Sequence, residues 1–349
     1  MKRFSILIAA LCLCLTGCGK QTTEAAAQIF AMDTVMEVAA YGEHAEQAVK
    51  YTEKRIEELE NRLSRTKAHS LVSGLNRDGS IRHLTYDYWN LIARAKEYRD
   101  ATNGAFDITI APVMDAWGFT GDSFRVPEQS ELDTLLKKVN SDAIQMLGSP
   151  SDSVTLGEGQ AIDLGGIAKG YTSDWVEQTF RANGIESGKI SLGGNVFVLG
   201  TKPDGSDWRV GIKDPRNESG LAAILSLRDA YAITSGGYER YFEENGKTYH
   251  HIIDPSTGYP ADSGLLSVTV VAADNGPDWA GAGNGAMCDA FSTALFVMGE
   301  EQALDFWRNG GYDFDLVLVT EDGRVVITAG LADRLEEVKD SGYTYETVS

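Results

Sequence analysis

Helical and strand patterns interleave along almost the whole of this chain, and this limits the fold class more than any other feature. Apolar residues three or four positions apart predict helices, at 44–63, 86–100, 167–182 and 285–298. Runs rich in Val, Ile and Leu between Gly, Asp or Pro predict strands, at 34–40, 189–199, 208–213, 221–227, 265–273, 315–320 and 324–328. We therefore expect one compact α+β unit, which could divide into two lobes.

The first 18 residues have the layout of a secretory signal. Lys2 and Arg3 precede an apolar run that ends in Leu-Thr-Gly-Cys at Cys18. This ending is similar to a bacterial lipobox, in which the cysteine carries the lipid; an ordinary signal peptide is the alternative. A bilayer span takes about 20 apolar residues, more than this run has. We expect a signal at 1–17, a flexible tether at 18–28, and an extracytoplasmic protein that a lipid on Cys18 anchors to the cell membrane.

The charge of the chain argues against a nucleic-acid partner. The formal net charge is −20 and is spread along the sequence, so the surface should repel polyanions. A pyrophosphate ligand would then need local neutralisation by a metal ion or a particular lysine. The sequence has no Gly-x-Gly-x-x-Gly after a first strand and no Gly-x-x-x-x-Gly-Lys-Ser/Thr. A Rossmann or P-loop nucleotide site is therefore not predicted.

A glycine turn opens the helix predicted at 167–182. Asp163 ends an apolar stretch, Gly165 and Gly166 follow, and Lys169 lies in the first turn of the helix. The start of a helix offers free N–H groups and a positive dipole end, which suit a phosphate. A lysine there opposes the dipole, which makes more sense if an anion binds. The alternative is a plain Asp-capped helix.

A carboxylate interrupts the apolar helix predicted at 285–298. Asp289 and Thr293 are four residues apart and share one face, and Ser292 is adjacent. A buried carboxylate is costly unless it is paired or binds a metal. Carboxylate, hydroxyl and carbonyl oxygens suit magnesium or calcium. The alternative is a set of local hydrogen bonds to the backbone.

Two adjacent histidines end a short strand before Asp254-Pro-Ser-Thr-Gly258. Strand alternation turns only one of His250 and His251 inward, for hydrogen bonding or proton transfer. Ser235 suggests a hydrolase nucleophile, but Gly-x-Ser-x-Gly is absent. Trp117 and Phe119, after Gly-Ala-Phe-Asp at 104–107, could stack on a flat ring or pack in the core.

Taken together, these motifs resemble the ApbE family of FAD:protein FMN transferases. They follow the family's order: Met-x-Thr at 32–34, Leu-Ser at 63–64, Leu-Asn at 75–76, GAFD at 104–107, WGF at 117–119, DLGGIAKG at 163–170, GGN at 193–195, TSGGYER at 234–240, HIIDPSTGYP at 251–260 and DAFSTALFVMG at 289–299. The resemblance implies a T-fold-like unit of mixed or antiparallel sheets with packed helices, which we place at 29–345.

The resemblance also implies roles for individual residues. FAD would be the substrate, contacted by Met32, Thr66, Ala105, Phe106, Asp107, Asp163, Lys169, His251, Ile252 and Ile253. One departure is Thr66, since many relatives carry an aromatic ring there. Magnesium, or else calcium or manganese, would be bound by the carbonyl of Gly166 together with Asp289, Ser292 and Thr293.

The implied reaction is transfer of FMN from FAD to a Thr or Ser hydroxyl of another protein, with release of AMP. His251 or Asp289 would take the hydroxyl proton. Acceptors in the family are subunits of membrane redox complexes and extracytoplasmic flavoproteins. Two alternatives remain open: a metal-dependent FAD pyrophosphatase, in which water replaces the hydroxyl, and a lipoprotein that binds FAD without chemistry.

Overall fold

A nine-stranded sheet organises the protein in the computed structural model, which describes residues 23–121, 123–148, 153–274, 276 and 283–349. The strand order is β1-β2-β6-β7-β10-β13-β14-β15-β17, antiparallel except for the last pair. These strands are β1 Glu24–Ala31, β2 Thr34–Tyr41, β6 Ser187–Leu192, β7 Asn195–Leu199, β10 Ala230–Gly236, β13 Leu265–Ala273, β14 Asp315–Thr320, β15 Arg324–Thr328 and β17 Thr344–Val348.

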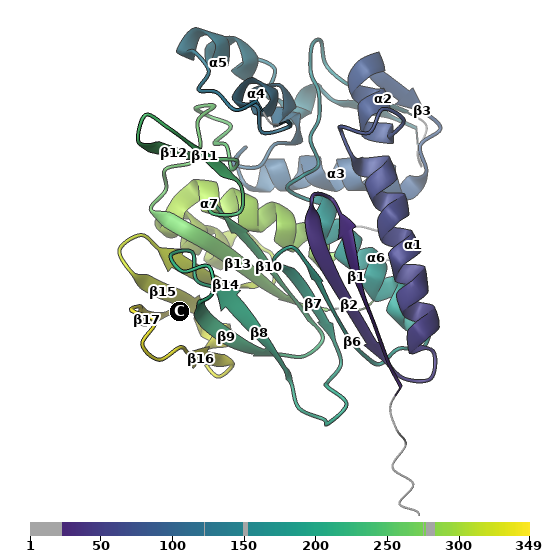
Figure 1. The fold of residues 1–349 in the computed structure, drawn as a ribbon. Coiled ribbons are helices and arrows are strands. Elements are labelled where there is room, and N and C mark those ends of the chain that lie inside the picture. Colours follow the sequence, from purple (N-terminus) through teal and green to yellow (C-terminus); the bar gives the residue numbers. More distant parts are fainter. Residues whose placement is uncertain (1–22, 122, 149–152, 275, 277–282) are drawn as a thin grey trace, which may run out of the picture.

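Helices cover one face of this sheet and a small sheet covers part of the other (Figure 1). On the first face lie α1 Ala45–Leu63, α6 Ala168–Ala182 and α7 Asn284–Asn309. The second face packs on β8 Trp208–Lys213, β9 Leu221–Leu227 and β16 Leu335–Glu337. Side chains that alternate along the central strands feed the two cores. The central strands of the large sheet are therefore buried between the helices on one face and the small sheet on the other.

The segment between α1 and α6 sits at one end of the layered body (Figure 1). It contains α2 Leu71–Asp78, α3 Tyr86–Ala101, α4 Ala111–Trp117, α5 Gln129–Leu136, and the short strands β3 Ser80–Arg82, β4 Gln145–Leu147 and β5 Ser153–Thr155. The hairpin of β11 Tyr241–Glu244 and β12 Lys247–His250 packs against α4 and α5 through an aromatic cluster around Trp117. This cluster brings the chain after β12 to the end of the sheet where α6 and α7 begin.

The four helices predicted from periodicity are present, and the mixed α+β class is confirmed. The strand predicted at 189–199 is wrong, because Gly193 and Gly194 have φ of 57° and 95° and turn it into the hairpin β6–β7. The tether predicted at 18–28 is wrong from residue 24, where β1 begins to pair with β2. The 29–345 unit is too short, since β17 ends at Val348. The signal and Cys18 lie outside the described residues.

Candidate functional site

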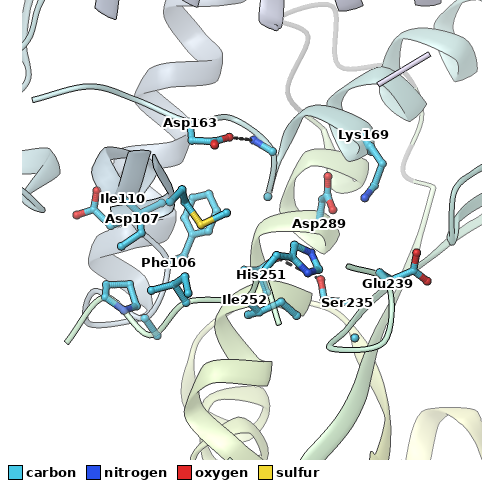
Figure 2. Close-up of a pocket in the computed structure, with 18 of the residues that line it drawn as sticks. Phe106, Asp107, Ile110, Asp163, Lys169, Ser235, Glu239, His251, Ile252 and Asp289 are labelled. Atoms are coloured by element: carbon cyan, nitrogen blue, oxygen red, sulfur yellow. Dashed lines mark hydrogen bonds between the residues drawn. The ribbon is translucent and has the colours of Figure 1, made fainter. Parts of the chain in front are cut away.

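A cavity opens where the starts of α6 and α7 meet the ends of the central strands (Figure 2). Its walls come from six separate stretches of chain: Ala105–Asp107 with α4, the turn before α6, Gly193 between β6 and β7, the end of β10, the segment after β12, and α7. Lys169, Asp289 and His251 surround one part of it, and Phe106 and Ile110 surround another (Figure 2). One region is therefore polar and charged, and the other is apolar.

The turn before α6 is held by Asp163. Its Oδ1 accepts a hydrogen bond from the N–H of Gly165 at 2.7 Å, and its Oδ2 accepts from Arg65 at 3.0 Å. Arg65 also pairs with Asp115 at 2.7 Å. Both carboxylate oxygens of Asp163 are thus used within the protein. Asp163 fixes the shape of the turn, and Arg65, which sequence reasoning missed, balances its charge.

Glycines allow α6 and α7 to approach very closely. A Cβ on Gly170 would lie 2.6 Å from Cβ of Asp289 and still nearer the carbonyl oxygen of Gly285. Because there is no side chain, the N–H of Gly170 donates to Oδ2 of Asp289 at 2.8 Å. A Cβ on Gly166 would lie 3.4 Å from Oγ1 of Thr293. The structure therefore brings the predicted turn and the predicted α7 residues together.

The contact between these helices runs in both directions. Asp174 on α6 accepts hydrogen bonds from the backbone N–H groups of Gly283, Gly285 and Ala286, at 2.9, 2.7 and 3.0 Å. These N–H groups stand at the start of α7, where the backbone N–H groups of a helix have no acceptor within the helix itself. Asp174 therefore caps α7, while Asp289 of α7 holds the first turn of α6. We call this pair of contacts the helix clamp.

His251 is the inward-facing member of the histidine pair. Its Nδ1 lies 3.1 Å from the carbonyl oxygen of Arg240, which can only accept, so Nδ1 carries the hydrogen and Nε2 offers a lone pair. Burial, with the charge of Lys169 next in importance, lowers the pKa of His251 to about 3. The imidazole is therefore neutral near pH 7. His250 lies against Phe296 and Ala261 instead.

The second region of the cavity is apolar. Phe106, Ile110, Met114, Ile252 and Ile253 line it. Asp107 also borders the cavity, but its carboxylate accepts from the backbone N–H and the hydroxyl of Thr109 at 2.8 and 2.6 Å, so it holds the loop in place. Trp117 and Phe119 are buried in the aromatic cluster, which supports the core-packing interpretation for both.

Three predicted site residues do not line the cavity. Met32 sits in the turn between β1 and β2 at a φ of 50°, with Sδ 3.8 Å from the hydroxyl of Thr172. Thr66 is exposed and bonds to Ser64. Ser292 is 0 % exposed, and its hydroxyl donates to the carbonyl of Asp289 at 2.9 Å. Its hydroxyl faces the protein interior and not the cavity, which does not favour the predicted role as a metal ligand.

Several cavity residues were missed by sequence reasoning. The sequence suggests Ser235 only as a nucleophile; the others are Ile110, Met114, Gly193, Thr234, Gly236, Glu239 and Pro255. The TSGGYER motif carried a signal for four of these residues, but β10 itself was not predicted. The missing strand hid the fact that its end opens into the cavity.

The described residues contain no cluster of three or more His, Cys, Asp or Glu side chains arranged for a metal. The candidate oxygen donors are instead one carboxylate, one hydroxyl and one carbonyl, from Asp289, Thr293 and Gly166. Hard cations such as magnesium take such oxygens and fill the remaining positions with water or substrate phosphate. The residues therefore fit a cation that binds together with an anionic substrate.

No helix in the described ranges has both the length and the hydropathy of a bilayer span.

Comparison with known proteins agrees with this geometry. The ApbE family model matches residues 32–316, a stretch that contains every wall of the cavity. The chain belongs to the ApbE family. Among the relatives of this ApbE chain is the FAD:protein FMN transferase of Treponema pallidum (strain Nichols), 31% identical over 307 residues, covering 83% of this chain and 82% of the relative. That of Klebsiella pneumoniae (strain 342) is 33% identical over 294 residues, with coverages of 82% and 86%.

Solved structures of ApbE proteins share the fold. The Thermotoga maritima ApbE protein superposes with a TM-score of 0.78 at 30% identity, covering 91% of this chain and 97% of the other. The apo form of the Pseudomonas stutzeri flavinyl transferase ApbE gives 0.73 at 27% identity, with coverages of 86% and 92%. The fold and the family are thus established together.

Proposed function

We propose that this chain is an FAD:protein FMN transferase that moves FMN from FAD to a Thr or Ser hydroxyl of an acceptor protein. The observation that carries the proposal is the meeting of the Gly166 turn, Asp289 and Thr293 in the polar region of the cavity. The cavity offers an apolar region for an isoalloxazine ring beside a polar one for a diphosphate. Membership of the ApbE family, and the names of its relatives, support the same activity.

In the proposed reaction the acceptor hydroxyl oxygen attacks the FMN-side phosphorus of FAD. A new P–O bond forms to the acceptor, the bond from this phosphorus to the bridging oxygen breaks, and AMP leaves. Bound magnesium, with manganese or calcium as alternatives, would withdraw charge from the diphosphate and stabilise the leaving AMP. Gly166, Asp289 and Thr293 would hold this ion. Positioning and charge neutralisation are expected to supply most of the acceleration.

Two side chains of the cavity have roles that their contacts support. Lys169 lines the cavity from the first turn of α6, and its positive charge favours a diphosphate there. His251 has a free lone pair on Nε2, and the negative charge of a bound diphosphate would raise its pKa from about 3 toward the range in which it can receive the proton of the attacking hydroxyl. Asp289 is less suited to that task, because one oxygen already accepts from Gly170 and a bound cation would reduce its basicity. We therefore assign the proton to His251.

The cellular setting is part of the same proposal. A lipid on Cys18 would anchor the enzyme on the outer side of the bacterial cell membrane. Subunits of membrane redox complexes and extracytoplasmic flavoproteins with an exposed Thr or Ser would be its acceptors. Cys18→Ala should move the protein from the membrane fraction to the soluble fraction after cell lysis. Continued membrane association of that variant would argue against the anchor.

One experiment separates the candidate activities. The mature chain is incubated with FAD, magnesium and a candidate acceptor domain, and a denaturing gel is examined for flavin fluorescence. A fluorescent acceptor band supports transfer. Release of FMN and AMP without labelling would replace the transferase with a pyrophosphatase, and unchanged FAD would leave only a binder. Asp289→Ala should abolish magnesium-dependent turnover, and wild-type rates in that variant would remove the cation assignment.

A further inference from the structure

A chain of hydroxyl groups connects β10 to the candidate cation site on α7. Ser235 Oγ lies 2.8 Å from Ser292 Oγ and 3.2 Å from Thr293 Oγ1. Ser292 Oγ in turn lies 2.9 Å from the backbone carbonyl oxygen of Asp289. Figure 2 shows Ser235 below Asp289, beside His251. None of these contacts involves a charged partner, so the direction of each hydrogen bond follows from counting hydrogens.

The count starts at the carbonyl, which can only accept. Each hydroxyl has one hydrogen to donate and two lone pairs. The Ser292 hydroxyl therefore donates its hydrogen to the carbonyl oxygen of Asp289, so in the 2.8 Å contact with Ser235 it must accept. The Ser235 hydroxyl thus donates its hydrogen to Ser292, so in the 3.2 Å contact with Thr293 it must accept. Each hydrogen therefore points along the chain in one direction, from Thr293 through the two serines to the backbone carbonyl of Asp289.

This direction decides which part of the Thr293 hydroxyl the cavity meets. With its hydrogen turned toward Ser235, the lone pairs of Oγ1 are left for the side where Gly166 lies. A cation is bound by lone pairs, and a hydroxyl hydrogen aimed at it would repel it. Outer partners that orient the ligands of a metal are commonly worth 10- to 100-fold in metal affinity.

We propose that Ser235 is a positioning residue that, together with Ser292, turns the Thr293 hydroxyl so that its lone pairs face the bound cation. The inference rests on the proposed function, because it assumes a cation at Asp289 and Thr293. It also explains two features that the sequence left open. Ser235 is not activated as a nucleophile, since its hydrogen is directed at the hydroxyl of Ser292, which is not a base, and Ser292 supports the site from inside the protein.

The test measures cation affinity directly. Mn²⁺ binding to the full chain with saturating FAD is followed by electron paramagnetic resonance. We expect Ser235→Ala to raise the Kd for Mn²⁺ by about 10-fold or more, a larger factor than any change in the Kd for FAD measured by fluorescence with EDTA present. Ser235→Thr, which keeps the hydroxyl, should restore most of the affinity. Ser226→Ala, on β9 and away from the cavity, is the matched control and should bind Mn²⁺ like the wild type.

A double-mutant cycle with Thr293→Val makes the test specific. Valine keeps the shape of threonine but has no hydroxyl to orient, so Ser235→Ala should have no further effect on Mn²⁺ affinity in that background. An unchanged Kd in the single Ser235→Ala variant, or an equal loss with and without Thr293, would overturn the inference. If Thr293→Val itself leaves Mn²⁺ binding intact, the cation site of the proposed function fails instead.

Discussion

The same substitution at two glycines should change stability in opposite directions. Gly170 and Gly74 both lie in helices, so an alanine at either position gains up to about 1 kcal/mol of intrinsic helix propensity. At Gly74 the nearest atom to a new Cβ would be Nη2 of Arg77 at 3.9 Å, an ordinary contact. Gly74→Ala should therefore stabilise the protein by about 0.5–1 kcal/mol.

At Gly170 two costs exceed that gain. The new Cβ would lie 2.6 Å from Cβ of Asp289, so α6 and α7 must separate by about 1 Å to reach a normal carbon–carbon contact. Overpacking of this kind costs about 1–3 kcal/mol. The separation also lengthens the Gly170–Asp289 hydrogen bond, and bonds to charged groups are worth about 1.5–3 kcal/mol. The expected net effect of Gly170→Ala is a loss of roughly 2–4 kcal/mol.

Urea unfolding followed by far-ultraviolet circular dichroism measures both variants against the wild type. The midpoint should fall for Gly170→Ala and rise slightly for Gly74→Ala, with similar slopes. Mn²⁺ affinity with FAD should also fall for Gly170→Ala alone, because Asp289 is displaced. A midpoint for Gly170→Ala at or above that of the wild type would refute the close-packing argument, whatever its activity.

Three further predictions concern the surroundings of the site. The pKa of His251 is about 3 in the folded chain and about 6.5 in the unfolded chain, so between pH 7 and pH 5 only the unfolded state protonates this imidazole. The free energy of unfolding should therefore fall by about 2 kcal/mol over that range. In urea titrations at the two pH values, His251→Gln should lack this roughly 2 kcal/mol of pH-dependent stability. The same pH dependence in the variant and the wild type would contradict a buried, neutral His251. Arg65→Met should raise the Kd for FAD about 5- to 20-fold in fluorescence titrations, because it leaves Asp163 without its partner at the turn; affinity equal to wild type would exclude the link. Asp174→Ala should destabilise the protein by about 3 kcal/mol, and Asp174→Asn by less, because alanine leaves three N–H groups at the start of α7 unpaired; equal losses in thermal unfolding would argue against capping.

Local spacing was enough to find the residues that act through their own helix or turn. Asp289 and Thr293 share a face because they are four residues apart, and the glycine turn before α6 is visible as a motif. The structure then places both at one cavity. Pairing between distant segments could not be read in this way. Asp174 looks like any mid-helix aspartate until the start of α7, more than 100 residues later, is packed against it.

The errors in the fold have local physical causes. Residues 24–28 of β1 are small and polar, which predicts a tether; they form a strand because the whole length of β1 pairs with β2 at the sheet edge. The Gly193–Gly194 pair was a hairpin signal that the surrounding valines and isoleucines masked. The helices α2, α4 and α5 have only seven or eight residues, too few to display a 3.6-residue period.

The helix clamp has a consequence for how such an enzyme can diversify. α6 holds the start of α7 and α7 holds the first turn of α6, so neither helix can shift without breaking contacts at both places. A donor pocket built on this pair is fixed before any ligand arrives. New acceptor preferences would then have to be found in segments that pack beside the cavity without lining it, such as the β11–β12 hairpin and α5. An engineer who wants to label a different protein with flavin should randomise those segments and leave the helix pair untouched.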